Sequence, residues 1–138
     1  HHLGAALDKT GRPEEALAHL RQAARHIPGW PLPLNHMAWI LATHPDAAVR
    51  DAATAIDHAK EASRLTDNRN PPILDTLAAA YAAAGQFDDA VRTAQTALEL
   101  AMAAGAKPLA EEIRGRLEAY RQSKPWRQPQ GSQDQPQP

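Results

Sequence analysis

The chain has 138 residues, 43% of them hydrophobic, with a formal net charge of −1 and no cysteine. Its near-neutral charge, spread along the sequence, argues against the basic face of a nucleic-acid-binding protein. The lack of cysteine excludes disulfides and thiol chemistry, and no apolar run approaches the ~20 residues needed to span a bilayer. Thirty alanines and only 4% aromatic residues favour closely packed helices, because alanine is the strongest helix former.

Two stretches, residues 3–23 and 77–97, share one pattern. Each has a first helix, a glycine turn at Gly11 or Gly85, and a second helix that begins with two acidic residues. Internal repetition of a helix–turn–helix unit predicts stacked helical hairpins. Glu14-Glu15 and Asp88-Asp89 resemble catalytic acid pairs, but we interpret them as helix-start residues, since negative charge complements the helix dipole there.

Residues 31–70 form a middle unit that keeps the two helices but carries an insertion at 43–51. Pro45 ends the first helix of this unit, because proline disfavours helical backbone at the residue before it. Asp46 and Asp51 are each followed by helix formers and are candidate N-caps. We therefore expect a helical turn after Asp46 and the main second helix after Asp51.

Beyond the third unit, Gly105 ends a helix and Pro108 opens another. The apolar residues after Pro108 fall on one narrow face of the predicted helix. A helix with a polar outer side is what closes a stack of repeats. We expect residues 106–122 to be this capping helix. Residues 123–138 are rich in proline and glutamine and form a tail that is expected to be disordered. Within this tail we expect Trp126, its one apolar anchor, to fold back against the capping helix.

The spacing between Gly11 and Gly85 fits one period of about 34 residues and one of about 40. Together with the small and aromatic residues of the third unit, this spacing resembles the pattern of the tetratricopeptide repeat (TPR). The resemblance covers residues 3 to about 127. The resemblance implies an all-α fold, a right-handed superhelix of antiparallel helix pairs with a C-terminal capping helix. Its units are residues 1–30 (cut at the N-terminus), 31–70 and 71–105, followed by the cap at 106–122 and the tail at 123–138.

The stretch from Asn35 to Asp46, together with residues 74–90, is also similar to the C-terminal TPR segment of large bacterial, planctomycete-like multidomain proteins. In those proteins the repeats are appended to membrane glycosyltransferases, protein kinases or other modules. The resemblance implies a non-catalytic interaction scaffold or, alternatively, a segment that positions substrate for such an enzyme. We expect the chain to be the C-terminal end of a longer array, with His1-His2 native, and the sequence does not indicate a compartment.

In the TPR family, the first helices of the units line a concave groove that binds a peptide or a partner domain. Trp39 is either a binding anchor or a packing residue on the neighbouring repeat, and Asn35 and Asp75 either pair with a peptide backbone or are solvated. A clamp for a C-terminal carboxylate is disfavoured, because Lys9 is the one candidate cation and Asp75 would repel an anion. The groove residues transferred by position are Asp8, Lys9, Leu32, Asn35, His36, Trp39, Thr43, Asp75, Thr76 and Ala79.

The sequence carries no catalytic pattern. Its seven histidines lack the HExxH spacing of a zinc enzyme, and neither a phosphate-binding glycine loop nor a nucleophile motif is present. We expect no enzymatic activity, no cofactor and no metal. The expected partner is a protein or peptide and not a nucleic acid, and self-association of the repeats remains an alternative.

Overall fold

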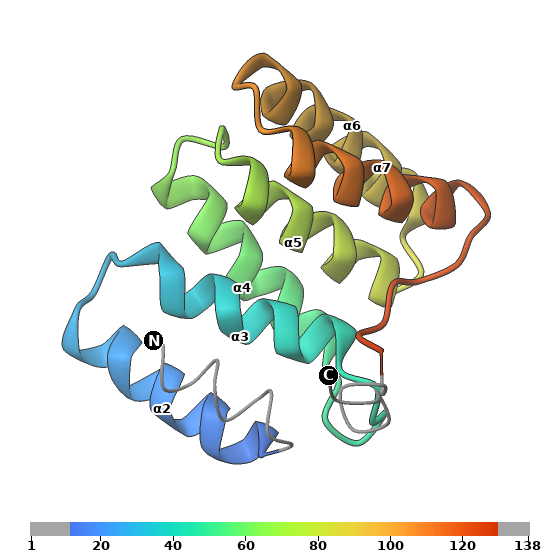
Figure 1. The fold of residues 1–138 in the computed structure, drawn as a ribbon. Coiled ribbons are helices and arrows are strands. Elements are labelled where there is room, and N and C mark those ends of the chain that lie inside the picture. Colours follow the sequence, from blue (N-terminus) through green and yellow to red (C-terminus); the bar gives the residue numbers. More distant parts are fainter. Residues whose placement is uncertain (1–11, 130–138) are drawn as a thin grey trace, which may run out of the picture.

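The computed structural model describes residues 12–129, and every regular element in that range is an α-helix. The helices follow one another through short connections and form a stack (Figure 1). This confirms the predicted all-α fold, whereas the right-handed sense of the superhelix remains a prediction. The helices are α2 (Pro13–His26), α3 (Pro31–Thr43), α4 (Ala52–Leu65), α5 (Pro71–Ala83), α6 (Phe87–Ala103) and α7 (Lys107–Arg121).

Proline and glycine mark the helix boundaries, and Pro108 opens α7 as the sequence predicts. Proline occupies one of the first two positions of α2, α3, α5 and α7, where its missing N–H leaves no hydrogen bond unmade. Gly85, after α5, has a φ of +79°, which a residue with a side chain adopts only with strain. The turn is closed by the Gln86 N–H, which donates to the Tyr81 carbonyl at 2.9 Å. The chain thereby reverses direction between α5 and α6.

The helices pack in two layers, with α3, α5 and α7 side by side in one and α4 and α6 in the other (Figure 1). One hydrophobic cluster joins α5, α6 and α7, and a second joins α2, α3 and α4 to α5. Small side chains allow the close approach of helices within these clusters. The alanines that are fully buried include Ala16, Ala38, Ala59, Ala78, Ala90 and Ala97.

The insertion in the middle unit forms a compact loop between α3 and α4. After Asp46, where a helical turn was expected, the chain makes one turn closed by the Val49 N–H donating to the Asp46 carbonyl at 3.0 Å, and the Asp46 carboxylate accepts from the Ala48 N–H at 2.9 Å. Arg50 holds the loop, because its guanidinium donates to the carbonyls of His44 and Pro45 at 2.6 and 3.0 Å. Asp51 is the N-cap of α4, as its position predicts.

Replacing Asp51 by alanine is expected to lower the free energy of unfolding by about 1 kcal/mol. The Asp51 carboxylate accepts hydrogen bonds from the Thr54 N–H at 3.2 Å and the Thr54 hydroxyl at 2.8 Å, and these hydrogen bonds lower the pKa of Asp51. Urea denaturation measures the loss, with Asp57→Ala on the same helix as the control. Equal stability of the two variants would contradict the capping role.

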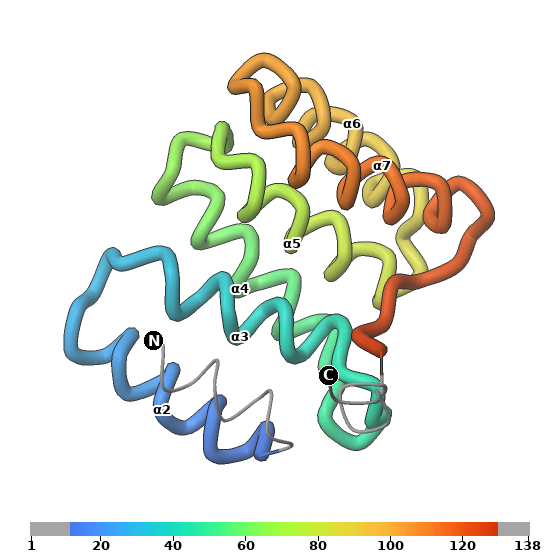
Figure 2. The backbone as a smooth tube through the Cα atoms, viewed as in Figure 1, coloured from blue at the N-terminus to red at the C-terminus, as the bar shows by residue number. Residues whose placement is uncertain are grey.

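Residues 124–129 do not extend away from the stack but cross from the end of α7 to the end of α3 (Figure 2). The Gln128 N–H donates to the Thr43 carbonyl at 2.7 Å, and the Gln128 side-chain amide donates to the Thr43 hydroxyl at 3.1 Å. The folding back of Trp126 agrees with the expectation from the sequence, whereas the ordered path of residues 124–129 differs from the disorder expected of the tail from residue 123. The reason is that Trp126 packs against the cluster of α5, α6 and α7, and the last carbonyls of α3 accept the hydrogen bonds of the segment. We call residues 124–129 the return segment.

Candidate functional site

A pocket of about 240 Å³ opens on the layer formed by α3, α5 and α7. Each of these helices contributes three residues to its lining, so the pocket exists only when the consecutive units are stacked. We call it the groove pocket. Its lining residues are Asn35, His36 and Trp39 of α3, Pro72, Asp75 and Thr76 of α5, and Leu109, Glu112 and Arg116 of α7.

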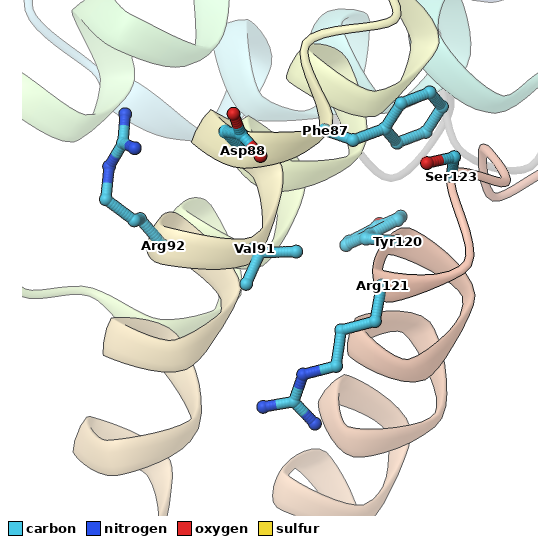
Figure 3. A pocket seen from close by; sticks show the side chains of 7 residues that line it. All are labelled: Phe87, Asp88, Val91, Arg92, Tyr120, Arg121 and Ser123. Carbon is cyan, nitrogen blue, oxygen red and sulfur yellow. The ribbon is translucent and has the colours of Figure 1, made fainter.

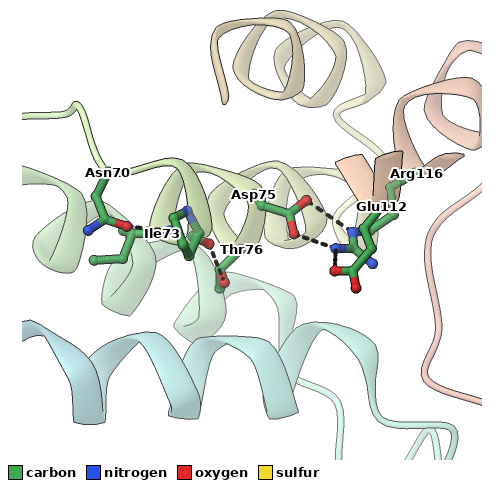
Figure 4. Close-up of polar contacts among 7 residues, drawn as sticks. Asn70, Ile73, Asp75, Thr76, Glu112 and Arg116 are labelled. Atoms are coloured by element: carbon green, nitrogen blue, oxygen red, sulfur yellow. Dashed lines mark hydrogen bonds and ion pairs between the residues drawn. The ribbon is translucent and has the colours of Figure 1, made fainter. Parts of the chain in front are cut away.

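A buried ion pair joins α5 to α7 beside this pocket. The Arg116 guanidinium donates through Nε to Asp75 Oδ1 at 3.0 Å and through Nη2 to Asp75 Oδ2 at 2.7 Å (Figure 4). The Glu112 carboxylate, which is exposed, lies 3.4 Å from the same Nη2 atom. Because two nitrogens of the guanidinium each donate to a different oxygen of the carboxylate, the pair fixes the orientation of the two side chains as well as their distance.

Burial and the charge of the partner shift the pKa of each member of this pair in opposite directions. Burial disfavours the cation at Arg116, but the hydrogen bonds and charge of Asp75 outweigh it and hold the pKa of the guanidinium above its ordinary value. Burial also raises the pKa of the Asp75 carboxyl, and the hydrogen bonds from Arg116 oppose that shift. Neither side chain therefore stays charged at low cost without the other.

Arg116 also contacts two indole rings. Its guanidinium carbon is 5.2 Å from the centroid of the Trp39 ring and 5.5 Å from that of the Trp126 ring, within the range of a cation–π interaction. Trp39 comes from α3 and Trp126 from the return segment. Arg116 thus connects α3, α5, α7 and the return segment.

The structure places the predicted groove residues in three groups. Asn35, His36, Trp39, Asp75 and Thr76 lie together in the groove pocket. Three further predicted residues of the described range lie outside it: Leu32 is exposed near the start of α3, Thr43 is buried beneath the return segment, and Ala79 is buried in the hydrophobic cluster. Asp8 and Lys9 lie outside the described residues.

Two of these placements differ from the prediction. Ala79 is 0% exposed and so offers no surface to a ligand, because its side chain packs between units. Asp75 is neither solvated nor free to pair with a peptide backbone, since both of its oxygens bind Arg116. Trp39 is half-buried: it packs against the cluster of α2, α3 and α4 and also lines the pocket, so the two interpretations of this residue are compatible.

The sequence analysis did not identify Arg116, which pairs with Asp75 and contacts the rings of Trp39 and Trp126. The signal was its register, because Arg116 follows Ile113 by three residues and Leu109 by seven, which places it on the inward face of α7. A charged residue at such a position needs a partner. That partner, Asp75, lies 41 residues earlier in the chain.

A second pocket, of about 360 Å³, lies between the start of α6 and the end of α7 (Figure 3). Phe87 and Val91 of α6 face Tyr120 of α7 across it, and exposed Arg92 and Arg121 stand at its edge. The Tyr120 hydroxyl is buried without a hydrogen-bond partner among the described residues, and burial raises its pKa. Apart from Tyr120 its lining is half-buried or exposed, and no ion pair organises it as Asp75 and Arg116 organise the groove pocket.

The described residues contain neither a metal-binding cluster nor a membrane-spanning helix. Between residues 12 and 129, no three histidine, cysteine, aspartate or glutamate side chains lie close enough together to hold a metal ion. Within the same range, no helix has the length and apolar character required to cross a membrane.

Comparison with known proteins agrees with this architecture. A tetratricopeptide-repeat family model matches residues 73–108, which contain most of α5 and all of α6, and a second matches residues 1–25. Comparisons with curated proteins and with solved structures gave no significant match. The two matched segments carry the two copies of the repeated pattern, and the described part of the chain is built from stacked helices. These two matches identify tetratricopeptide repeats in this chain.

Proposed function

We propose that the chain is a non-catalytic interaction scaffold that binds an extended peptide, or an extended segment of a partner domain, in the groove pocket. Tetratricopeptide repeats generally mediate protein–protein interaction, and stacked units create extended surfaces for such partners. The observation that carries the proposal is the meeting of Asn35, Trp39 and Glu112 in one pocket built by three helices.

The chemistry of these residues suits a peptide. Trp39 offers a large, rigid ring that is not fully covered, and such rings are frequent anchors of protein interfaces. The side-chain oxygen of Asn35 is buried without a hydrogen-bond partner among the described residues, which costs about 1–3 kcal/mol. A peptide N–H that reached this oxygen would remove that cost.

Charge favours a neutral or basic peptide over an acidic one. The positive charge of Arg116 is matched by Asp75 at 2.7 Å, while the exposed Glu112 carboxylate adds a second negative charge at the edge of the pocket. An anionic peptide would meet a net negative site. The pocket is therefore unsuited to a C-terminal carboxylate, in line with the expectation from the sequence.

Replacing Trp39 by alanine is expected to weaken peptide binding at least about tenfold, the effect of losing an aromatic anchor from an interface. Peptides are first selected from a random twelve-residue library with the full chain, and their dissociation constants are then measured by fluorescence anisotropy. The control is Met102→Ala, an exposed apolar residue of α6 outside the pocket. Circular dichroism checks that both variants keep their helices.

Two results would contradict the proposed function. One is that the full chain selects no peptide above background. The other is that the selected peptides bind Trp39→Ala and the unmodified chain with equal affinity, which would place their binding site elsewhere.

A further inference from the structure

We infer that the return segment is an intramolecular ligand of the groove, and that the partner competing with it is an extended segment with an aromatic side chain followed by a basic one. This inference rests on the proposed function, because it assigns an occupant to the end of the same groove. The return segment contains Trp126 followed by Arg127, and its contacts show which chemistry this end of the groove accepts.

The backbone of the return segment is held as a bound peptide would be. The Gln128 N–H donates to the Thr43 carbonyl at 2.7 Å, and the Arg127 guanidinium lies 3.4 Å from the Ala42 carbonyl. Both acceptors belong to the last turn of α3, where carbonyls have no partner within their own helix. Any extended segment carries the backbone N–H that the Thr43 carbonyl accepts, so this contact does not depend on sequence.

Side-chain specificity comes from Trp126. Its ring lies over the Arg116 guanidinium, on the cation that also contacts Trp39 and pairs with Asp75 in the groove pocket. The ring is only half-buried, so it rests on the surface of the stack and is not enclosed by it. An aromatic side chain from a partner would meet the same cation at the same place.

The return segment lies on the surface of the stack. Trp126, Arg127 and Gln128 are half-buried, and Lys124, Pro125 and Pro129 are exposed. Such a segment can be displaced without opening the hydrophobic clusters. A tethered segment nevertheless competes at an effective concentration in the millimolar range, so it blocks weak ligands and yields to a stronger one.

The test uses the full chain and a fluorescent peptide with the sequence of residues 122–130. In the unmodified chain the return segment occupies the site, whereas Trp126→Ala removes its anchor and Gln128→Pro removes its N–H donor. We expect both variants to bind the peptide at least about tenfold more tightly than the unmodified chain, because the tethered competitor is lost. The control is Lys124→Ala, an exposed residue of the same segment, which should bind the peptide like the unmodified chain.

The specificity of the site is tested with a peptide in which the residue corresponding to Trp126 is alanine, which should bind no variant. The inference is overturned if the unmodified chain and Trp126→Ala bind the original peptide equally, or if neither binds it at concentrations up to about 1 mM. It is also overturned if the alanine peptide binds as well as the original.

These outcomes are separable from failure of the proposed function. If library peptides bind through Trp39 but are unaffected by Trp126→Ala, the groove is a peptide site and the return segment is not its competitor. If the tail peptide binds Trp126→Ala while neither the unmodified chain nor Trp126→Ala selects a library peptide, the site accepts its own segment and the proposed binding of other peptides is wrong.

Discussion

Replacing Asp75 by alanine is expected to lower the free energy of unfolding by about 3–5 kcal/mol, the usual cost of leaving one member of a buried ion pair without its partner. Arg116 is 9% exposed and would lose both of its short hydrogen bonds, at 3.0 and 2.7 Å. The exposed Glu112, at 3.4 Å, would not replace them, because solvent screens its charge. Urea denaturation followed by circular dichroism measures the loss.

Two further variants show whether the loss comes from the unpaired charge. Asp75→Ala combined with Arg116→Met should be more stable than Asp75→Ala alone, since it removes the buried cation together with its partner. Glu112→Ala should change stability by about 0.5 kcal/mol or less, as exposed substitutions usually do. If Asp75→Ala costs less than about 1 kcal/mol, the pair is solvated in solution and does not fix α5 against α7 beside the groove pocket.

Replacing Ile113 by alanine is expected to cost about 2–5 kcal/mol, through lost apolar burial and the cavity left behind. Ile113 is 0% exposed in the cluster shared by α5, α6 and α7, so its removal loosens α7 from the rest of the stack. Thermal and urea denaturation measure the effect. Glu118→Ala, on the outer side of α7, is the matched control and should stay within about 0.5 kcal/mol of the unmodified chain.

The Ile113 result also reports on the role of α7. A loss of less than about 1 kcal/mol, with amides of α7 exchanging as fast as in the unfolded chain, would mean that α7 is not part of the cooperative unit. The groove pocket would then be incomplete in solution, because three of its lining residues belong to this helix.

The helices of the fold were predictable because their signals are local. Pro108 near the first position of α7, the Gly85 turn and the Asp51 cap each act within one turn of the chain, and each is found where the sequence places it. The insertion was less predictable. Whether the residues after Asp46 continue as a helix depends on Arg50 bonding back to His44 and Pro45, a contact that no periodicity indicates.

The site was predictable only in part. The register of a repeated first helix brings Asn35, Trp39 and Asp75 toward one face, and the structure places all three in one pocket. Register does not report which inward side chains become covered by a neighbouring unit, as Ala79 is. Nor does it identify Arg116 as the partner of Asp75, because that pairing joins separate units and depends on how they stack.

The return segment changes how the units of this protein depend on one another. In a simple stack each unit contacts only its neighbours, so stability is close to a sum of nearest-neighbour terms, and the ends can fray independently. The hydrogen bond from Gln128 to Thr43 spans 85 residues and bypasses α4, α5 and α6. Beside this hydrogen bond, Arg116 contacts the rings of Trp39 and Trp126. Together these contacts tie the end of the described stack back to α3, so opening of α7 also removes contacts from α3.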